Sequence, residues 1–196
     1  MNYFLTKQVI YFKFKISPKI IKLAAVIPVV FFIFFIKGSK RIPETFIVGV
    51  IGAVPEEYLF RGIILGKILK LLSIKLNNKR MSIIISIILS SLIFGSMHAI
   101  NLMHQPLLFT VAQMIQTFGL VMLLAAVYIK SGSIIFPMLI HFSLDSMVIL
   151  IVGYSKAMMG VQHVSILSTG IMLFLYTIVS VGVMANKHEN ILLSRL

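Results

Sequence analysis

The chain contains, at residues 107–129, the stretch LLFTVAQMIQTFGLVMLLAAVYI, which carries no charged side chain. A helix needs about 20 predominantly apolar residues to cross the hydrocarbon core of a bilayer, so this stretch predicts a transmembrane helix. Other apolar segments of this kind occur along the chain at Ile20–Ile36, Thr45–Leu72, Ile83–Leu102, Ile134–Tyr154 and Val164–Ala185. Together they predict an all-α, polytopic membrane helix bundle with about six transmembrane segments.

The second segment, Thr45–Leu72, is longer than one span requires and contains Pro55. Proline removes a helical hydrogen bond and its ring crowds the preceding turn, so we expect a kink or a break there. A break would raise the number of segments to about seven or eight. The first segment, Ile20–Ile36, follows a basic flank but is too long and too aromatic for a signal-peptide core. Because no small-residue cleavage site follows it, we interpret it as an uncleaved span.

The composition also indicates a lipid environment. Of the 196 residues, 59% are hydrophobic and 12% are charged, and the mean hydropathy is +1.06, whereas a soluble domain carries about 25% charged residues. The formal net charge of +13 could suggest nucleic-acid binding. However, the basic residues lie between hydrophobic spans, where they contact anionic headgroups, and no soluble basic face remains to hold a duplex. The absence of cysteine excludes disulfides, thiolate metal sites and a cysteine nucleophile.

Lysine and arginine are distributed unequally between the two sides of the predicted bundle. One side carries most of them: Lys7, Lys13, Lys15, Lys19, Lys22, Lys67, Lys70, Lys75, Lys79, Arg80, Lys130, Lys187 and Arg195. The other side carries Lys37, Lys40, Arg41 and Lys156. Cytoplasmic connections are enriched in Lys and Arg, so we predict a multi-pass protein of the cell membrane with both termini in the cytoplasm.

Two of the five acidic residues are adjacent within apolar sequence, in the run Pro55-Glu56-Glu57-Tyr58-Leu59-Phe60-Arg61. An acidic side chain near the centre of a membrane helix costs roughly 2.5–3.5 kcal/mol, which indicates that the pair has a function. Pro55 suits the first turn of a helix, so we expect both glutamates in that turn, near the positive end of the helix dipole. Glu57 and Arg61 are four residues apart and can pair, while Glu56 points about 100° away. One glutamate would thus be held by arginine and the other available as a general base.

The same run is also compatible with a structural ion pair and a spare acid that lines a proton or substrate path. Two intramembrane histidines favour catalysis. His98 ends the block Phe94-Gly95-Ser96-Met97-His98, and His141 begins the block His141-Phe142-Ser143-Leu144-Asp145, whose spacing places His141 and Asp145 on one helical face. Two imidazoles and a carboxylate can hold a catalytic Zn²⁺ with one position open for water, and the same groups could polarise a water without a metal.

The depth of each group in the bilayer can be counted along its segment. At 1.5 Å per residue, Glu56 lies about 16 Å into its segment, whereas His98 and His141 lie about 22 Å and about 10 Å from the cytoplasmic ends of theirs. These depths permit a common site only if the helices tilt or the segment boundaries shift by a few residues.

The three blocks follow one another on successive apolar segments as Glu56-Glu57-x-x-x-Arg61, Phe94-x-x-x-His98 and His141-x-x-x-Asp145. They resemble the CPBP family of intramembrane proteases, also called the Abi or CAAX-protease family. The pattern of that family is Glu-Glu-x-x-x-Arg, then Phe-x-x-x-His, then His-x-x-x-Asn or a similar residue. The resemblance covers about Thr45 to Leu150. Each block is weak alone, but three in order in a multi-span protein are a fairly specific signal.

The resemblance implies peptide-bond hydrolysis inside the membrane. In eukaryotic relatives the substrate is a prenylated protein that loses its last three residues, and bacterial relatives are linked to bacteriocin self-immunity and to maturation of peptide signals. By carry-over, Glu56 would activate the water, and His98 and His141 would position it or stabilise the oxyanion. Asp145 stands where the family often has asparagine. Because an ionised aspartate cannot donate a hydrogen bond, Asp145 would orient His141 or bind metal.

Other expectations follow from the same resemblance. The residues that would shape the site are Glu57, Arg61 and Phe94. The family is described as metalloproteases, and a metal-free, glutamate-based mechanism is also argued for it. The candidate ligands for a Zn²⁺ ion are Glu56, His98 and His141.

The chain is expected to divide into three parts. These are a basic N-terminal flank with the first transmembrane helix (1–44), a CPBP-like catalytic helix core (45–154), and a C-terminal transmembrane helix with a short tail (155–196). An intramembrane endopeptidase is the favoured function. The alternatives are a non-catalytic bacteriocin-immunity or binding protein, and a proton-coupled transporter in which Glu56, Glu57 and Asp145 relay protons. The expected partners are the bilayer and a membrane-associated peptide or protein substrate, without nucleic acid.

Overall fold

The computed structural model describes residues 9–12, 41–160, 164–185 and 190–195, and every regular element in these ranges is a helix. The elements are α3 (Ile42–Glu57), η2 (Tyr58–Leu65), α4 (Gly66–Lys75), α5 (Lys79–Met97), η3 (His98–Met103), α6 (Leu107–Ser131), α7 (Ile135–Val152), α8 (Tyr154–Met159), α9 (Ile166–Ala185) and α10 (Ile191–Arg195). The predicted all-α fold is therefore confirmed. The predicted span Ile20–Ile36 lies outside the described residues.

Four helical stretches are long and apolar enough to cross a membrane: Lys79–Met103, Leu107–Ser131, Ile135–Val152 and Ile166–Ala185. They coincide with four of the predicted segments, with ends that differ by a few residues. Their outer faces are apolar, and on α9 Ile166 and Leu167 are 80% and 73% exposed. Large apolar side chains exposed to this degree over whole helices are typical of a surface that meets lipid. The chain is therefore a membrane protein.

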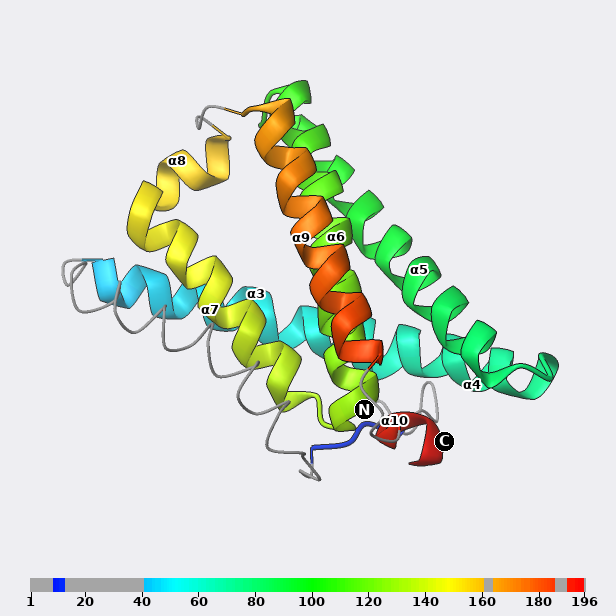
Figure 1. Ribbon diagram of the computed structural model, residues 1–196. Helices are drawn as coiled ribbons and strands as arrows, with labels where there is room; N and C mark the ends of the chain where they lie inside the picture. The colour runs from blue at the N-terminus through cyan, green and yellow to red at the C-terminus, as the bar shows by residue number, and fades with distance from the viewer. Residues whose placement is uncertain (1–8, 13–40, 161–163, 186–189, 196) are drawn as a thin grey trace.

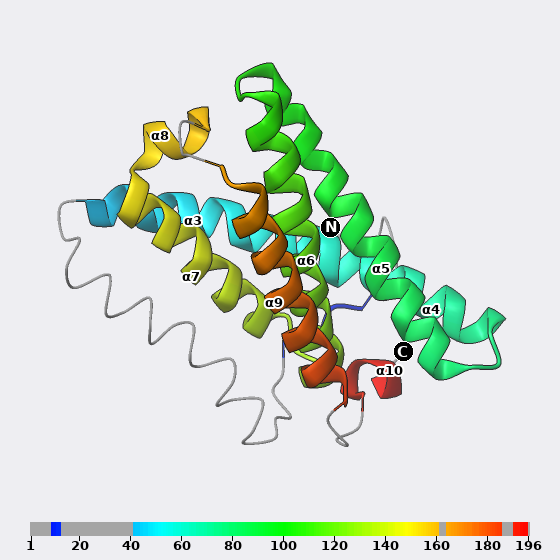
Figure 2. The same ribbon diagram turned by 45° about the horizontal axis from the view of Figure 1, so that its top comes forward.

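The second predicted segment, Thr45–Leu72, is divided into shorter helices. The α3 helix ends at Glu57, the π-helical η2 follows it directly, and α4 begins at Gly66. These parts have 16, 8 and 10 residues, so the segment supplies none of the four membrane-crossing stretches. Figures 1 and 2 show that α3 crosses the bundle at a steep angle to α6. The predicted kink or break at Pro55 is not seen as an interruption: the backbone stays in the right-handed helical region, and only the helix type changes, at Tyr58.

The α6 helix is the centre of the described structure, with α5 and α9 packed along it and α7 beside it (Figures 1 and 2). Its second half is buried on every side, from Leu123 to Ser131. A helix that is surrounded by its neighbours in this way is hydrophobic all round, as the run LLAAVYI within it is. The α3 helix packs chiefly against α7, and this pairing brings the two acidic blocks of the sequence together.

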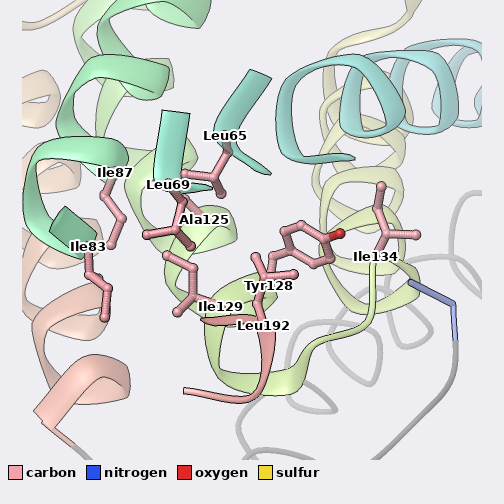
Figure 3. Packing of buried hydrophobic residues seen from close by; sticks show 9 residues of the cluster. All are labelled: Leu65, Leu69, Ile83, Ile87, Ala125, Tyr128, Ile129, Ile134 and Leu192. Carbon is pink, nitrogen blue, oxygen red and sulfur yellow. The ribbon is translucent and has the colours of Figure 1, made fainter. Parts of the chain in front are cut away.

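A cluster of nine buried residues joins η2, α4, α5 and α6 to the start of α7 and to α10 (Figure 3). Leu65 and Leu69 lie in it with no exposed surface. Removing such a buried leucine side chain to alanine costs about 2–5 kcal/mol. The cluster therefore fixes the end of η2, and with it the position of the residues just before.

Residues 9–12 and 190–195 lie together at the turn between α6 and α7. The Arg195 guanidinium donates from Nη1 to the carbonyl oxygen of Gly132 at 2.7 Å, and the Tyr11 hydroxyl donates to the Arg195 carbonyl oxygen at 2.6 Å. Gly132 ends α6 with φ of 60°, in the left-handed region that glycine adopts without steric cost. Residues 9–12 and 190–195 thus lie at one end of the described bundle. The side of the membrane that they face stays a prediction.

Candidate active site

The core of the site is a buried ion pair between Glu57 and Arg61. The Arg61 Nε lies 2.9 Å from Glu57 Oε2, and the two side chains are 1% and 0% exposed. The guanidinium also lies over the ring of Phe94, 4.9 Å from its centroid. None of its three nitrogens forms a hydrogen bond of good geometry among the described residues, so its contact with Glu57 is an ion pair. The guanidinium is therefore stabilised mainly by the Glu57 carboxylate and the face of the Phe94 ring. The four-residue spacing of Glu57 and Arg61 predicted the first of these contacts.

The prediction that Pro55 begins a helix is wrong. The α3 helix begins at Ile42 with Pro43 in its first turn, and Pro55 lies inside it, near its end. The two glutamates therefore end α3, and they do not lie at the positive end of its dipole. Proline interrupts the regular hydrogen-bond pattern of an α-helix, and the backbone after it continues as the π-helical η2. Such π-helical turns occur frequently at functional sites. The positive charge beside Glu57 therefore comes from Arg61, in η2, and not from the positive end of a helix dipole.

His141, on α7, contacts both glutamates at the end of α3. Its Nδ1 lies 2.8 Å from Glu57 Oε1, in a buried hydrogen bond. Its Nε2 lies 3.3 Å from Asp145 Oδ2 and 3.9 Å from Glu56 Oε2. An ionised carboxylate only accepts hydrogen bonds, so the His141 Nδ1–H donates the bond and Glu57 Oε1 accepts it. The ring is thereby fixed in orientation, with its other nitrogen directed towards the remaining two acids.

Glu56 and Glu57 are neighbours in sequence but lie in different environments. The Glu57 side chain has no exposed surface, whereas the Glu56 side chain is 42% exposed. Glu57 uses both carboxylate oxygens, one towards Arg61 and the other towards His141. Glu56 makes only the long 3.9 Å contact with His141 Nε2 among the ion pairs of the described residues. Its carboxylate is therefore available to a molecule that enters the site.

His98 joins the group through Phe94. Its Nδ1 donates to the Phe94 carbonyl oxygen at 3.2 Å, and the two ring centroids are 5.2 Å apart. The Phe94 ring, in turn, lies 6.3 Å from the ring of His141 and packs edge-on against Phe60 at 4.5 Å. His98 is also near enough to His141 and Asp145 to interact with both electrostatically. In a neutral imidazole whose Nδ1 donates, Nε2 is a hydrogen-bond acceptor.

A catalytic Zn²⁺ ion needs three protein ligands that converge on one point. The part of the chain that the structure describes contains no group of three His, Cys, Asp or Glu side chains arranged to hold a metal ion. Both ring nitrogens of His141 face carboxylates, Nδ1 that of Glu57 and Nε2 that of Asp145. The arrangement of Glu56, His98 and His141 therefore does not fit a shared ion. A metal role stays a prediction from the sequence, and no step below passes through one.

The structure brings the first and third predicted blocks into direct contact at His141, and the second block joins them through Phe94. Gly52 is not among the predicted site residues, yet it lies against Asp145 where α3 and α7 approach closely. The signal that could have found it is the spacing of Gly49 and Gly52, because small residues three apart on a membrane helix permit close helix contacts.

Comparison with known proteins gives one match. The model of the type II CAAX prenyl endopeptidase Rce1-like family matches residues 38–147. This range contains every residue of the site, from Glu56 to Asp145. No curated protein and no solved structure matches the chain.

Proposed function

The chain belongs to the type II CAAX prenyl endopeptidase Rce1-like family, and we propose that Glu56 activates the water with which this membrane protease hydrolyses its substrate. The observation that carries the proposal is the difference between the two adjacent glutamates. Glu57 is sealed, with one carboxylate oxygen 2.9 Å from Arg61 and the other 2.8 Å from His141, while Glu56 is 42% exposed and makes only the 3.9 Å contact with His141. A general base must be within reach of the water from which it takes a proton, and of the two glutamates only Glu56 is exposed.

The reaction follows from the chemistry of these groups. The Glu56 carboxylate takes a proton from water while the water oxygen attacks the carbonyl carbon of the substrate. The oxyanion that forms then collapses and breaks the C–N bond, and the proton on Glu56 passes to the leaving amine. The products are one carboxylic acid, which ionises by giving its proton to water or to the released amine, and one amine, and the enzyme returns to its starting state. General base catalysis of this kind contributes about 10²- to 10⁴-fold to the rate.

The two histidines have different roles in this proposal. His98 donates from Nδ1 to a backbone carbonyl oxygen, so its Nε2 can accept the second hydrogen of the attacking water. His141 has Nδ1 committed to Glu57 at 2.8 Å, whereas its Nε2 lies 3.3 Å from Asp145, beyond the usual range of a hydrogen bond between nitrogen and oxygen. Because carboxylates face both ring nitrogens, His141 would act as the imidazolium, with a proton on Nε2 as well as on Nδ1. Its weakly engaged Nε2–H is a suitable donor to the developing oxyanion. Asp145 would orient the ring from that side.

The proposal is tested with purified protein in proteoliposomes and a fluorescent peptide that carries a farnesylated Cys-a-a-X terminus, the substrate class in the family description. Glu56→Gln keeps the shape of the side chain but removes the base, so the cleavage rate should fall by about 10²-fold or more. Glu44→Gln is the matched control, because Glu44 is an exposed glutamate on the same helix and should retain full activity. Cleavage at the wild-type rate by Glu56→Gln would exclude the proposal.

The same variants distinguish an enzyme from a binding protein in cells. We infer that any protection against a bacteriocin, or any peptide maturation, depends on hydrolysis. Cells that carry Glu56→Gln should then lose the phenotype, although the protein reaches the membrane in the same amount as the wild type. Full protection by the inactive variant would instead support a non-catalytic immunity role.

A further inference from the structure

Two glycines of α3, Gly49 and Gly52, lie close against α7, and the two positions meet different groups. A methyl group on Gly49 would lie 2.5 Å from Ser146 Oγ and within 3 Å of the Phe142 ring. A methyl group on Gly52 would lie 2.7 Å from Asp145 Oδ2, with the next side-chain atom, Asp145 Cγ, at 4.0 Å. Gly49 thus faces the packed interface, and Gly52 faces only the tip of one carboxylate.

The oxygen that lies against Gly52 is the same atom that contacts the catalytic histidine. Asp145 Oδ2 is 3.3 Å from His141 Nε2. Ordinary contact between a carbon and its neighbour begins near 3.4 Å, so a methyl group on Gly52 would displace this oxygen by at least about 0.7 Å. The carboxylate is 35% exposed and has room to turn away, so the displacement is cheap for the fold. The displacement would change the 3.3 Å contact between Asp145 Oδ2 and His141 Nε2.

We propose that Gly52 is a positioning residue of the active site, whose missing side chain admits the Asp145 carboxylate to the position from which it orients His141. This inference rests on the proposed function, since it assumes that His141 acts in the reaction. The backbone of α3 at Gly52 lies directly against the carboxylate, which belongs to Asp145 of α7. Asp145 and His141 both belong to α7, so α3 acts by limiting where the Asp145 carboxylate can turn.

The test measures peptide cleavage by Gly52→Ala in proteoliposomes. A displacement of this size at a catalytic group can cost up to about 100-fold in rate. We expect kcat to fall by about 10- to 100-fold while KM changes little, because the perturbed contact orients a reacting group and binds no substrate. Gly49→Ala is the matched control: it makes the same change on the same helix, and any effect it has should appear in thermal stability.

A double-variant cycle identifies the route of the effect. In an Asp145→Ala background no carboxylate remains to be displaced, so Gly52→Ala should cause no further loss of kcat. Gly49→Ala should have the same effect in both backgrounds. The inference is overturned if Gly52→Ala retains the wild-type kcat, if Asp145→Ala retains it, or if the losses from Gly52→Ala and Asp145→Ala multiply. Wild-type activity of Glu56→Gln is a separate result that refutes the proposed function itself.

Discussion

Replacing Arg61 by methionine should destabilise the protein strongly, because it leaves the Glu57 carboxylate buried without its cation. The pair has a separation of 2.9 Å, and neither side chain exceeds 1% exposure. Breaking a buried pair by removing one partner costs about 3–5 kcal/mol. That cost corresponds to a change of roughly 100- to 4,000-fold in the unfolding constant. Loss of the Arg61 contact with the Phe94 ring at 4.9 Å acts in the same direction.

The measurement is reversible unfolding of the reconstituted protein in mixed micelles, with Lys67→Met as the control. Lys67 is an exposed basic residue one helix further along the chain, so its replacement should change the free energy of unfolding little. A second variant, Glu57→Gln combined with Arg61→Met, carries no buried charge at either position. It should recover most of the lost stability, because glutamine can still accept the hydrogen bond from His141 Nδ1.

The reasoning would be refuted if Arg61→Met lost less than about 1 kcal/mol, the value typical of an exposed pair. It would also be refuted if the double variant were no more stable than Arg61→Met. In that case the guanidinium would act through shape and packing, and the charge of Glu57 would play no part in the loss.

Two further predictions concern the metal and the end of the bundle. Incubation of the wild-type protein with a strong Zn²⁺ chelator should leave the cleavage rate unchanged, because the described residues form no three-ligand group; a loss that added Zn²⁺ restores would contradict this. Gly132→Ala should lower the free energy of unfolding by about 1 kcal/mol, since φ at this position is 60° and alanine is strained there. Unfolding in mixed micelles measures that change, and an unaltered midpoint would show that the turn relaxes at no cost.

Much of the fold could be predicted from the sequence because the bilayer requires long apolar helices. Four predicted segments correspond to helices of membrane-crossing length. The division of Thr45–Leu72 into α3, η2 and α4 was harder to predict, because proline is found both in the first turn of a helix and at kinks. Pro43 takes the first role, whereas Pro55 lies inside α3 just before the π-helical η2, and hydropathy alone does not separate the two positions.

The site was predictable where it depends on spacing within one helix. The pairs Glu57–Arg61 and His141–Asp145 are both four residues apart, and both form contacts. The contact between Glu57 and His141 joins residues 84 positions apart. It depends on how closely α3 packs against α7, and sequence spacing does not give that distance.

The depths counted along the segments allow a common site only if the helices tilt or the segment boundaries shift. The α3 helix crosses the bundle at a steep angle to α6 (Figures 1 and 2). The number of residues along α3 therefore does not measure the depth of Glu56. Helix tilt is set by packing against neighbouring helices, which composition does not reveal.

The most direct test of the account is whether water reaches position 56 within the lipid bilayer. The chain has no cysteine, so Glu56→Cys and Ile51→Cys each introduce a single thiol on α3. Ile51 is 66% exposed, but it belongs to an apolar surface that should meet lipid. A charged thiol reagent reacts with the thiolate, which forms only where water is present. With reagent on both sides of the membrane, we expect position 56 to be labelled and position 51 to stay unlabelled. An unreactive thiol at position 56, or equal labelling at the two positions, would contradict the proposal that Glu56 activates water.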